Sequence, residues 1–198
     1  MSTSQPITRL FLAIFLLLQA ACIGTTPPSR FYLLEPISLD NINEMAGSRL
    51  SVSLAPVRIP HYLDRVQIVT ATGKNSYQLN ELHRWAESLD DNITRVMLQN
   101  LTSLVPADVV ISRTHRSKQA QVSLAVTILE FHIDSEDHAV LVAQWQVNRG
   151  DEIVVNEQNN YRLPVSNDDV HSQVQVLNEC LNQFSRDIAL ALKSLKVS

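Results

Sequence analysis

The chain has 198 residues, of which 45% are hydrophobic and 18% charged, and its formal net charge is −4. This length suits one domain with a sizeable core, and the charges of both signs are interspersed, with no basic stripe typical of nucleic-acid binding. The chain has only four glycines and lacks a glycine-rich phosphate loop and the GxSxG, HExxH and CxxC motifs. We therefore expect no nucleic-acid binding, no enzymatic activity, no cofactor and no metal.

The first 22 residues have the composition of a signal peptide that ends before a lipid-modified cysteine. Arg9 supplies a basic charge, Leu10 to Leu18 form an apolar run, and two alanines precede Cys22. The run is about half the ~20 residues that a membrane-spanning helix needs, which argues against an uncleaved anchor. Removing residues 1–21 leaves 177 residues with a net charge of −5, because Arg9 is the only charged residue lost.

Acyl chains on Cys22 would hold the mature protein at a membrane, since each buried CH₂ group contributes about 0.8 kcal/mol and several chains exceed the marginal hold of one. The alternative is an ordinary secretory signal with an incidental cysteine, because Gln19 stands where lipoprotein signals usually carry Leu. Ile23 follows Cys22, in place of the Asp that retains many lipoproteins at the inner membrane, which favours the periplasmic face of the outer membrane. Residues 22–29 are short, polar and contain two prolines, so we expect a flexible tether.

Residues 30–198 are predicted to form a single domain that begins with strands. Leu50, Val52 and Leu54 alternate with polar residues, the period of a half-buried strand. Turn residues at positions 73–75 predict a β-hairpin. The strands expected in this half are Arg30–Glu35, Arg49–Val57, Val66–Thr72 and Ser76–Leu79.

The second half is predicted to contain two long helices separated by strands. Apolar residues recur every three or four positions over Arg84–Val105, where Pro106 ends the helix, and again over Val170–Leu195. Cys180 lies within the second stripe and is expected to be a buried thiol. The strands expected between the helices are Asp108–Arg113, Gln121–Ile133 with a β-bulge near Leu129, Ala139–Asn148 and Glu152–Leu163. We therefore predict an α+β fold, with a mixed, mainly antiparallel sheet and two long helices packed on one face.

The segment from His132 to His138 is the one local cluster of metal-ligand residue types, at a predicted hairpin tip. A solvated acidic turn explains the same residues more simply, and we expect no metal there.

Two other segments are candidates for a partner interface. Between two prolines and an Asp-Arg pair, His61, Tyr62 and Leu63 could form an exposed tip, or Tyr62 and Leu63 could be plugs folded back on the core. Arg84 and Trp85 combine residue types favoured at interface hot spots, although Trp85 is also a candidate core anchor and Arg84 an ion-pair partner for Asp64. The interface candidates are Tyr62, Leu63, Asp64, Arg65, Arg84 and Trp85.

The order of these motifs resembles the PqiC/YmbA-like ABC-type transport auxiliary lipoproteins over nearly the whole mature chain. The best motifs are the Tyr-Leu-Asp-Arg segment at residues 62–65 and the Arg-Trp-Ala-Glu segment at residues 84–87. The residues that carry the resemblance are Cys22, Arg30 to Leu34, Val57, Pro60 to Arg65, Gln67 to Val69, Arg84 to Leu89, and Trp145.

The resemblance implies a non-enzymatic outer-membrane lipoprotein with a sheet and two helices. Its partner would be a periplasm-spanning MCE-domain (mammalian cell entry) protein, fed by an inner-membrane ABC transporter or permease, and lipids or other hydrophobic molecules would move through the assembly. Some relatives form homo-oligomers, so self-association is also implied. We expect a docking module anchored through Cys22; the alternative is a periplasmic lipid carrier with an apolar pocket lined by residues such as Leu124, Phe131 and Phe184.

Overall fold

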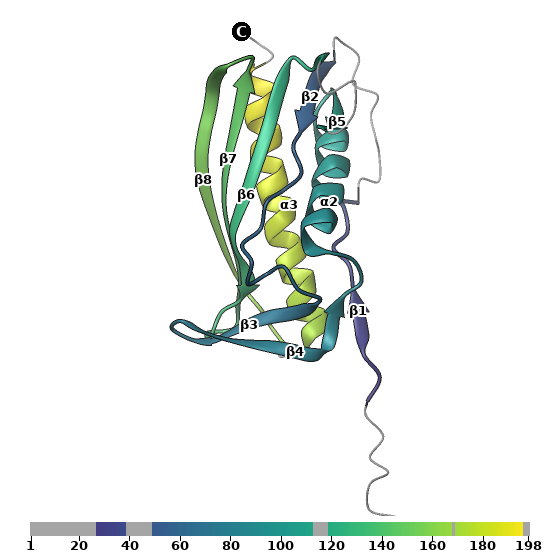
Figure 1. The fold of residues 1–198 in the computed structure, drawn as a ribbon, viewed down its shortest axis with the longest axis vertical. Coiled ribbons are helices and arrows are strands. Elements are labelled where there is room, and N and C mark those ends of the chain that lie inside the picture. Colours follow the sequence, from purple (N-terminus) through teal and green to yellow (C-terminus); the bar gives the residue numbers. More distant parts are fainter. Residues whose placement is uncertain (1–26, 39–48, 113–118, 168, 196–198) are drawn as a thin grey trace, which may run out of the picture.

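A computed structural model describes residues 27–38, 49–112, 119–167 and 169–195 (Figure 1). The predicted signal peptide and Cys22 lie outside the described residues. The described chain forms an eight-stranded sheet and two helices, which confirms the predicted α+β class. The elements are β1 (Arg30–Tyr32), β2 (Leu50–Leu54), β3 (Gln67–Gly73), β4 (Ser76–Trp85), α2 (Leu89–Leu104), β5 (Ala107–Ile111), β6 (Val122–Ile133), β7 (His138–Arg149), β8 (Glu152–Pro164) and α3 (Val170–Leu195).

Strand β6 is the centre of the sheet, because it pairs with three other strands: β7 along one edge, and β2 and β3 along the other. One edge joins the antiparallel meander β6-β7-β8, which contains the longest pairings. Along the other edge, β2 lies parallel to the beginning of β6, with Val52 opposite Val122, and β3 meets its end, with Thr70 opposite Ile133. The strand order is β1-β4-β3-β6-β2-β5, and β7 and β8 branch from β6. The sheet contains parallel and antiparallel pairs, so it is mixed as predicted.

Local irregularities in the strands agree with the sequence pattern. The register between β6 and β7 shifts between Ile128 and Glu130, which confirms the β-bulge predicted near Leu129. The shift moves the apolar residues that follow onto the face that the earlier ones occupy. The predicted hairpin is confirmed between β3 and β4, where Asn75 adopts φ 61° in the left-handed region that tight turns require.

Both helices lie behind the sheet in Figure 1, and the core fills the space between the two layers. Cys180 of α3 is buried, as predicted, with its Sγ atom 3.7 Å from the carbonyl oxygen of Ala139. Leu124, Phe131 and Phe184, the residues named for a carrier pocket, are packed within this core. Within the described ranges, no helix is both long and apolar enough to span a bilayer.

The first helix begins later than predicted. Strand β4 continues to Trp85, where it pairs with β1, and the backbone N–H of Trp85 donates to the carbonyl oxygen of Val66 at 2.7 Å. Helix α2 therefore starts at Leu89 rather than Arg84. Trp85 lies in phase with the apolar stripe of the helix, so periodicity alone extended the helix backward. The missed signal was Ser88, an extended N-cap residue followed by acidic residues at positions 90 and 91.

Candidate docking site at the β1 end

All six interface candidates lie at one end of the molecule. The β1 end comprises β1, the loop of residues 57–66, the β3-β4 hairpin and the first turns of α3, at the bottom of Figure 1. The predicted tether of residues 22–29 joins the domain at this end, because β1 starts at Arg30. The candidates therefore lie at the end of the domain where the predicted tether joins it, although they come much later in the sequence.

The side chains of the 57–66 loop divide between the core and the surface. Leu63 is only 2% exposed, and its backbone N–H donates to the carbonyl oxygen of Pro60 at 2.9 Å. Tyr62 is half-buried and packs against the core. Of the two interpretations left open by the sequence, plugs folded onto the core are therefore confirmed for this pair. Asp64 and Arg65 are exposed and form the surface of the loop.

Tyr62 belongs to an aromatic cluster with Tyr77 and His132. The ring centroids of Tyr62 and Tyr77 are 5.1 Å apart, and those of Tyr77 and His132 are 5.4 Å apart. Burial raises the pKa of the Tyr62 hydroxyl above its usual value. Burial also lowers the pKa of His132, against the opposing effect of the carboxylates of Glu130 and Asp134. The cluster therefore holds uncharged rings between the β3-β4 hairpin and β6.

The turn after His132 is organised around Asp134. Its Oδ1 atom accepts the backbone N–H groups of Glu136 and His138, each at 2.9 Å. The guanidinium of Arg162 donates to Oδ2 at 2.8 Å through Nε. Although burial opposes it, these hydrogen bonds lower the pKa of Asp134. Nowhere in the described part of the chain do three His, Cys, Asp or Glu side chains gather in a group that could hold a metal ion.

Trp85 and Arg84 lie at the end of β4 with opposite environments. Trp85 is 5% exposed, and its ring centroid is 6.4 Å from that of Phe131, so it is a core anchor. Arg84 is partly exposed, and its Nη2 atom lies 3.8 Å from Oε2 of Glu81. The suggested pairing of Arg84 with Asp64 is therefore wrong; Glu81, three residues earlier on the same strand, lies beside Arg84.

Three asparagines that the sequence analysis did not single out fix the chain just after β1. We call Asn92, Asn100 and Asn178 the asparagine clamp. The Oδ1 atom of each accepts one backbone N–H at 2.8 Å; the donors, in the same order, are Leu34, Ile37 and Glu35. Because the clamp draws on both helices, it ties the segment that leaves β1 to the body of the domain.

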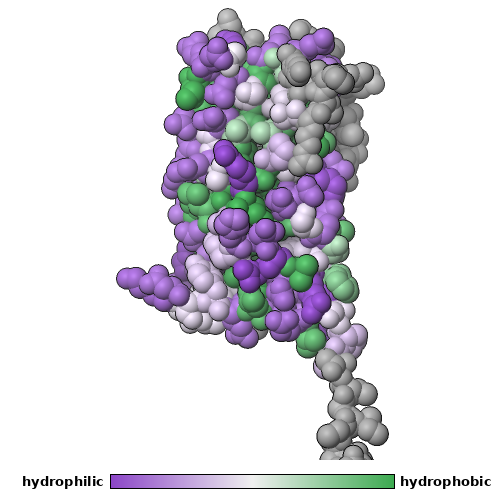
Figure 2. All heavy atoms as spheres, in the orientation of Figure 1, coloured by the Kyte–Doolittle hydropathy of each residue, from purple (hydrophilic) through white to green (hydrophobic). Residues whose placement is uncertain are grey.

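Exposed apolar side chains are concentrated at the β1 end. Among the described residues, large hydrophobic side chains are exposed at six positions, and four of these belong to the β1 end: Phe31, Leu33, Val66 and Tyr77. Figure 2 shows hydrophobic residues among hydrophilic ones at the lower end of the visible face. Phe31 and Leu33 also line a pocket of about 380 Å³, whose opposite wall is the first two turns of α3.

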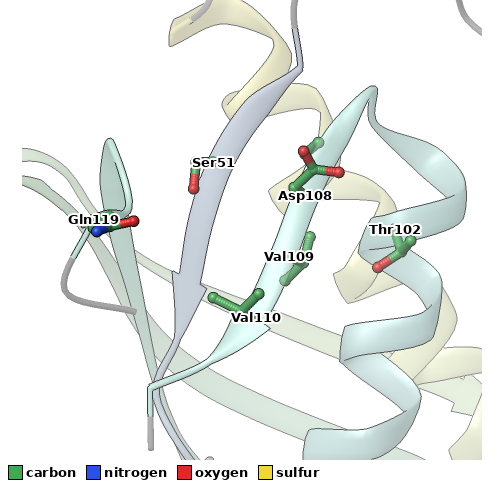
Figure 3. Close-up of a pocket in the computed structure, with 7 residues that line it drawn as sticks. Ser51, Thr102, Asp108, Val109, Val110 and Gln119 are labelled. Atoms are coloured by element: carbon green, nitrogen blue, oxygen red, sulfur yellow. The ribbon is translucent and has the colours of Figure 1, made fainter. Parts of the chain in front are cut away.

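A second pocket, of about 440 Å³, lies at the other end of the domain (Figure 3). Asp108, Val109 and Val110 of β5 form one wall, with Ser51 of β2 and Thr102 of α2 on either side. None of the interface candidates lines this pocket.

Comparison with known proteins agrees with the resemblance seen in the sequence. The chain is 27% identical over 151 residues to the intermembrane transport lipoprotein PqiC of Escherichia coli strain K12, a match that covers 75% of this chain and 78% of that protein. The protein of the same name from Shigella flexneri matches to the same extent.

Two crystal structures share the fold. One is of an uncharacterized protein, with 23% identity and a TM-score of 0.71, covering 84% of this chain and 99% of the other. The second is of a protein from Xanthomonas campestris, with 12% identity and a TM-score of 0.69, covering 85% of this chain and 100% of the other. The family described as the ABC-type transport auxiliary lipoprotein component matches residues 32–189. Since this match spans most of the chain, the protein belongs to the ABC-type transport auxiliary lipoprotein family.

Proposed function

We propose that this protein is a non-enzymatic docking component of a trans-envelope system that transports lipids or other hydrophobic compounds. Acyl chains on Cys22 anchor it to the periplasmic face of the outer membrane, and its partner is a periplasm-spanning MCE-domain protein. The family match over residues 32–189 carries the proposal, and the relatives named as intermembrane transport lipoproteins support it. An inner-membrane ABC transporter or permease acts at the far end of the same path.

The position of the tether determines how the domain faces the membrane. The chain enters at Arg30, so the β1 end is the end closest to the anchor. The asparagine clamp and the pairing of β1 with β4 transmit this attachment to both helices and to the sheet. An anchored domain gains a high effective concentration for a partner that must find the same membrane, so a modest contact area is sufficient.

The docking contact uses the exposed polar side chains of the β1 end. Asp64, Arg65 and Arg84 reach solvent, while Leu63 and Trp85 are buried beneath them. The Nε atom of Arg65 donates to the carbonyl oxygen of Tyr62 at 2.6 Å, which orders its side chain. A charged surface backed by packed residues is preorganised, which lowers the entropic cost of binding a partner.

The test is capture of the soluble domain of the MCE protein by the purified lipoprotein. Charge reversal of both arginines, Arg65→Glu with Arg84→Glu, is expected to weaken capture at least tenfold, since charge mismatch at an interface costs several kcal/mol. Arg186→Glu, an exposed arginine of α3 that pairs with Glu179, is the matched control and should bind as wild type does. Equal capture by wild type, the double variant and Arg186→Glu would show that the docking site does not lie on this surface.

The anchor is tested separately with labelled palmitate. Wild-type protein should incorporate the label and sediment with outer membranes, whereas Cys22→Ser should do neither. Wild-type protein released unlabelled into the periplasmic fraction would contradict the proposed localisation.

A further inference from the structure

The segment of residues 31–34, which follows the predicted tether, carries apolar side chains on both of its faces. It begins in β1, an edge strand of the sheet. Tyr32 and Leu34 point inward: the Tyr32 hydroxyl lies 2.7 Å from Nδ1 of His83, and Leu34 is fully buried. Successive side chains of extended chain alternate between faces, so Phe31 and Leu33 project together to the outside. They are 64% and 45% exposed. An edge of this kind usually carries polar residues on its solvent face, so this pair requires an explanation.

Phe31 and Leu33 cannot turn into the core, because the segment is fixed on both sides. Phe31 lies in register with Arg84 of β4, and the asparagine clamp holds the backbone from Leu34 onward. The inward positions are already filled by Tyr32 and Leu34. The outward orientation of the pair is thus a property of the folded domain and does not depend on a partner.

The length of chain before Phe31 indicates what covers this pair. Phe31 lies nine positions after Cys22, and nine fully extended residues span at most about 32 Å. Phe31 is therefore held within this distance of the acylated residue, and Leu33, two residues further on, within about 40 Å. A tether that is less than fully extended brings both closer. Any protein partner must diffuse to this position, whereas the bilayer that holds the anchor is always within reach.

We propose that Phe31 and Leu33 contact the outer-membrane bilayer itself and insert at the boundary between headgroups and acyl chains. This inference rests on the proposed lipid anchor at Cys22. Apolar side chains gain free energy at this boundary, and an adjacent basic residue is attracted to anionic headgroups. Arg30 is exposed directly beside Phe31. The anchor and the apolar pair then form two points of attachment, which orient the domain on the membrane.

The test places a tryptophan at the proposed contact. The variant Phe31→Trp, acylated and reconstituted in vesicles of phosphatidylethanolamine and phosphatidylglycerol, is compared in normal and brominated lipids, since bromine quenches only nearby indole rings. The native Trp85 and Trp145 are buried and give a constant background. The matched control is Leu190→Trp, because Leu190 is 63% exposed on the part of α3 that lies toward the opposite end.

Brominated lipids are expected to quench the added fluorescence of Phe31→Trp at least twofold and to leave Leu190→Trp unchanged. Equal signals from the two acylated, vesicle-bound variants would overturn the bilayer contact and leave the lipid anchor intact. An emission shift of Phe31→Trp that depends on protein concentration and not on bromine would assign the pair to a second copy, and would also overturn the contact. Failure of acylation and of vesicle binding would overturn the proposed anchor, and with it this inference.

Discussion

At the level of single residues, neighbouring side chains of the 57–66 loop have opposite roles. Leu63 is buried against the core, whereas Asp64 and Arg65 reach solvent. The sequence identified this stretch as unusual but left open which side chains point inward, because a loop between prolines has no periodicity from which its direction can be read. The ion-pair partner of Arg84 could not be predicted either. Glu81 lies beside it because both residues belong to β4, a strand that the sequence pattern ended at Leu79.

Replacement of Leu63 by Ala is expected to destabilise the domain by about 2–5 kcal/mol, because it leaves a cavity in a packed site. Replacement of the adjacent Asp64 by Ala should change stability by no more than about 0.5 kcal/mol, as is usual for an exposed residue. Urea unfolding followed by circular dichroism measures both. A Leu63→Ala protein as stable as Asp64→Ala would show that the loop is not packed in solution.

His132 should make the stability of the domain depend on pH. Burial lowers its pKa in the folded state, so the unfolded chain, with a histidine pKa near 6.5, binds the proton more readily. The stabilisation is complete above the unfolded pKa and decreases as the pH falls from there toward the folded pKa. Unfolding free energy measured between pH 7.5 and 5 should therefore decline less steeply for His132→Gln than for wild type. Parallel slopes for the two proteins would contradict an uncharged, buried His132.

At the level of elements, the two helices could be predicted more readily than the contacts between elements. The long stripe of α3 and the bulge in β6 followed from apolar spacing, which reports which face is buried. The boundary between β4 and α2 was missed because Trp85 satisfies both a buried strand position and the helical repeat. The asparagine clamp was also missed, since Asn92 and Asn100 are polar residues in a helix and their partners lie more than fifty residues earlier.

The residues of the asparagine clamp are expected to contribute unequally to the free energy of unfolding. Asn92→Ala removes two buried hydrogen bonds, because Oδ1 accepts from the Leu34 N–H and Nδ2 donates to the Leu34 carbonyl at 3.3 Å. The Leu34 carbonyl keeps Nη2 of Arg95 as a donor at 3.4 Å, but the buried N–H is left without an acceptor. An unsatisfied buried group costs about 1–3 kcal/mol, so the loss should be roughly 2 kcal/mol. Asn178→Ala removes one exposed bond and should cost less than about 1 kcal/mol.

Hydrogen exchange at the Leu34 amide, together with urea unfolding, compares the two variants. Faster exchange at Leu34 is expected only for Asn92→Ala. If Asn178→Ala proved equally costly, the clamp would depend on the α3 contact rather than on burial.

At the level of the whole molecule, the fold separates two ends with different surfaces. The β1 end holds the predicted docking residues and most of the exposed apolar side chains among the described residues, while α2 and α3 both run away from it (Figure 1). Sequence periodicity predicted the α+β layers, and the order of motifs indicated the family. Neither could show that residues near positions 31, 63 and 84 meet at one end, because that depends on β1 pairing with β4, a strand more than fifty residues later in the sequence.

The burial of Cys180 has a practical consequence for anyone wishing to attach reporter groups to this protein. Burial raises the pKa of its thiol to about 12, so almost none of the reactive thiolate forms at neutral pH. If the sulfur of Cys22 is already bonded to glyceride, the mature polypeptide offers no accessible nucleophilic sulfur. A cysteine introduced at an outer position would then react alone with a maleimide dye, and distance measurements by fluorescence could be made on the otherwise unaltered molecule in its native envelope.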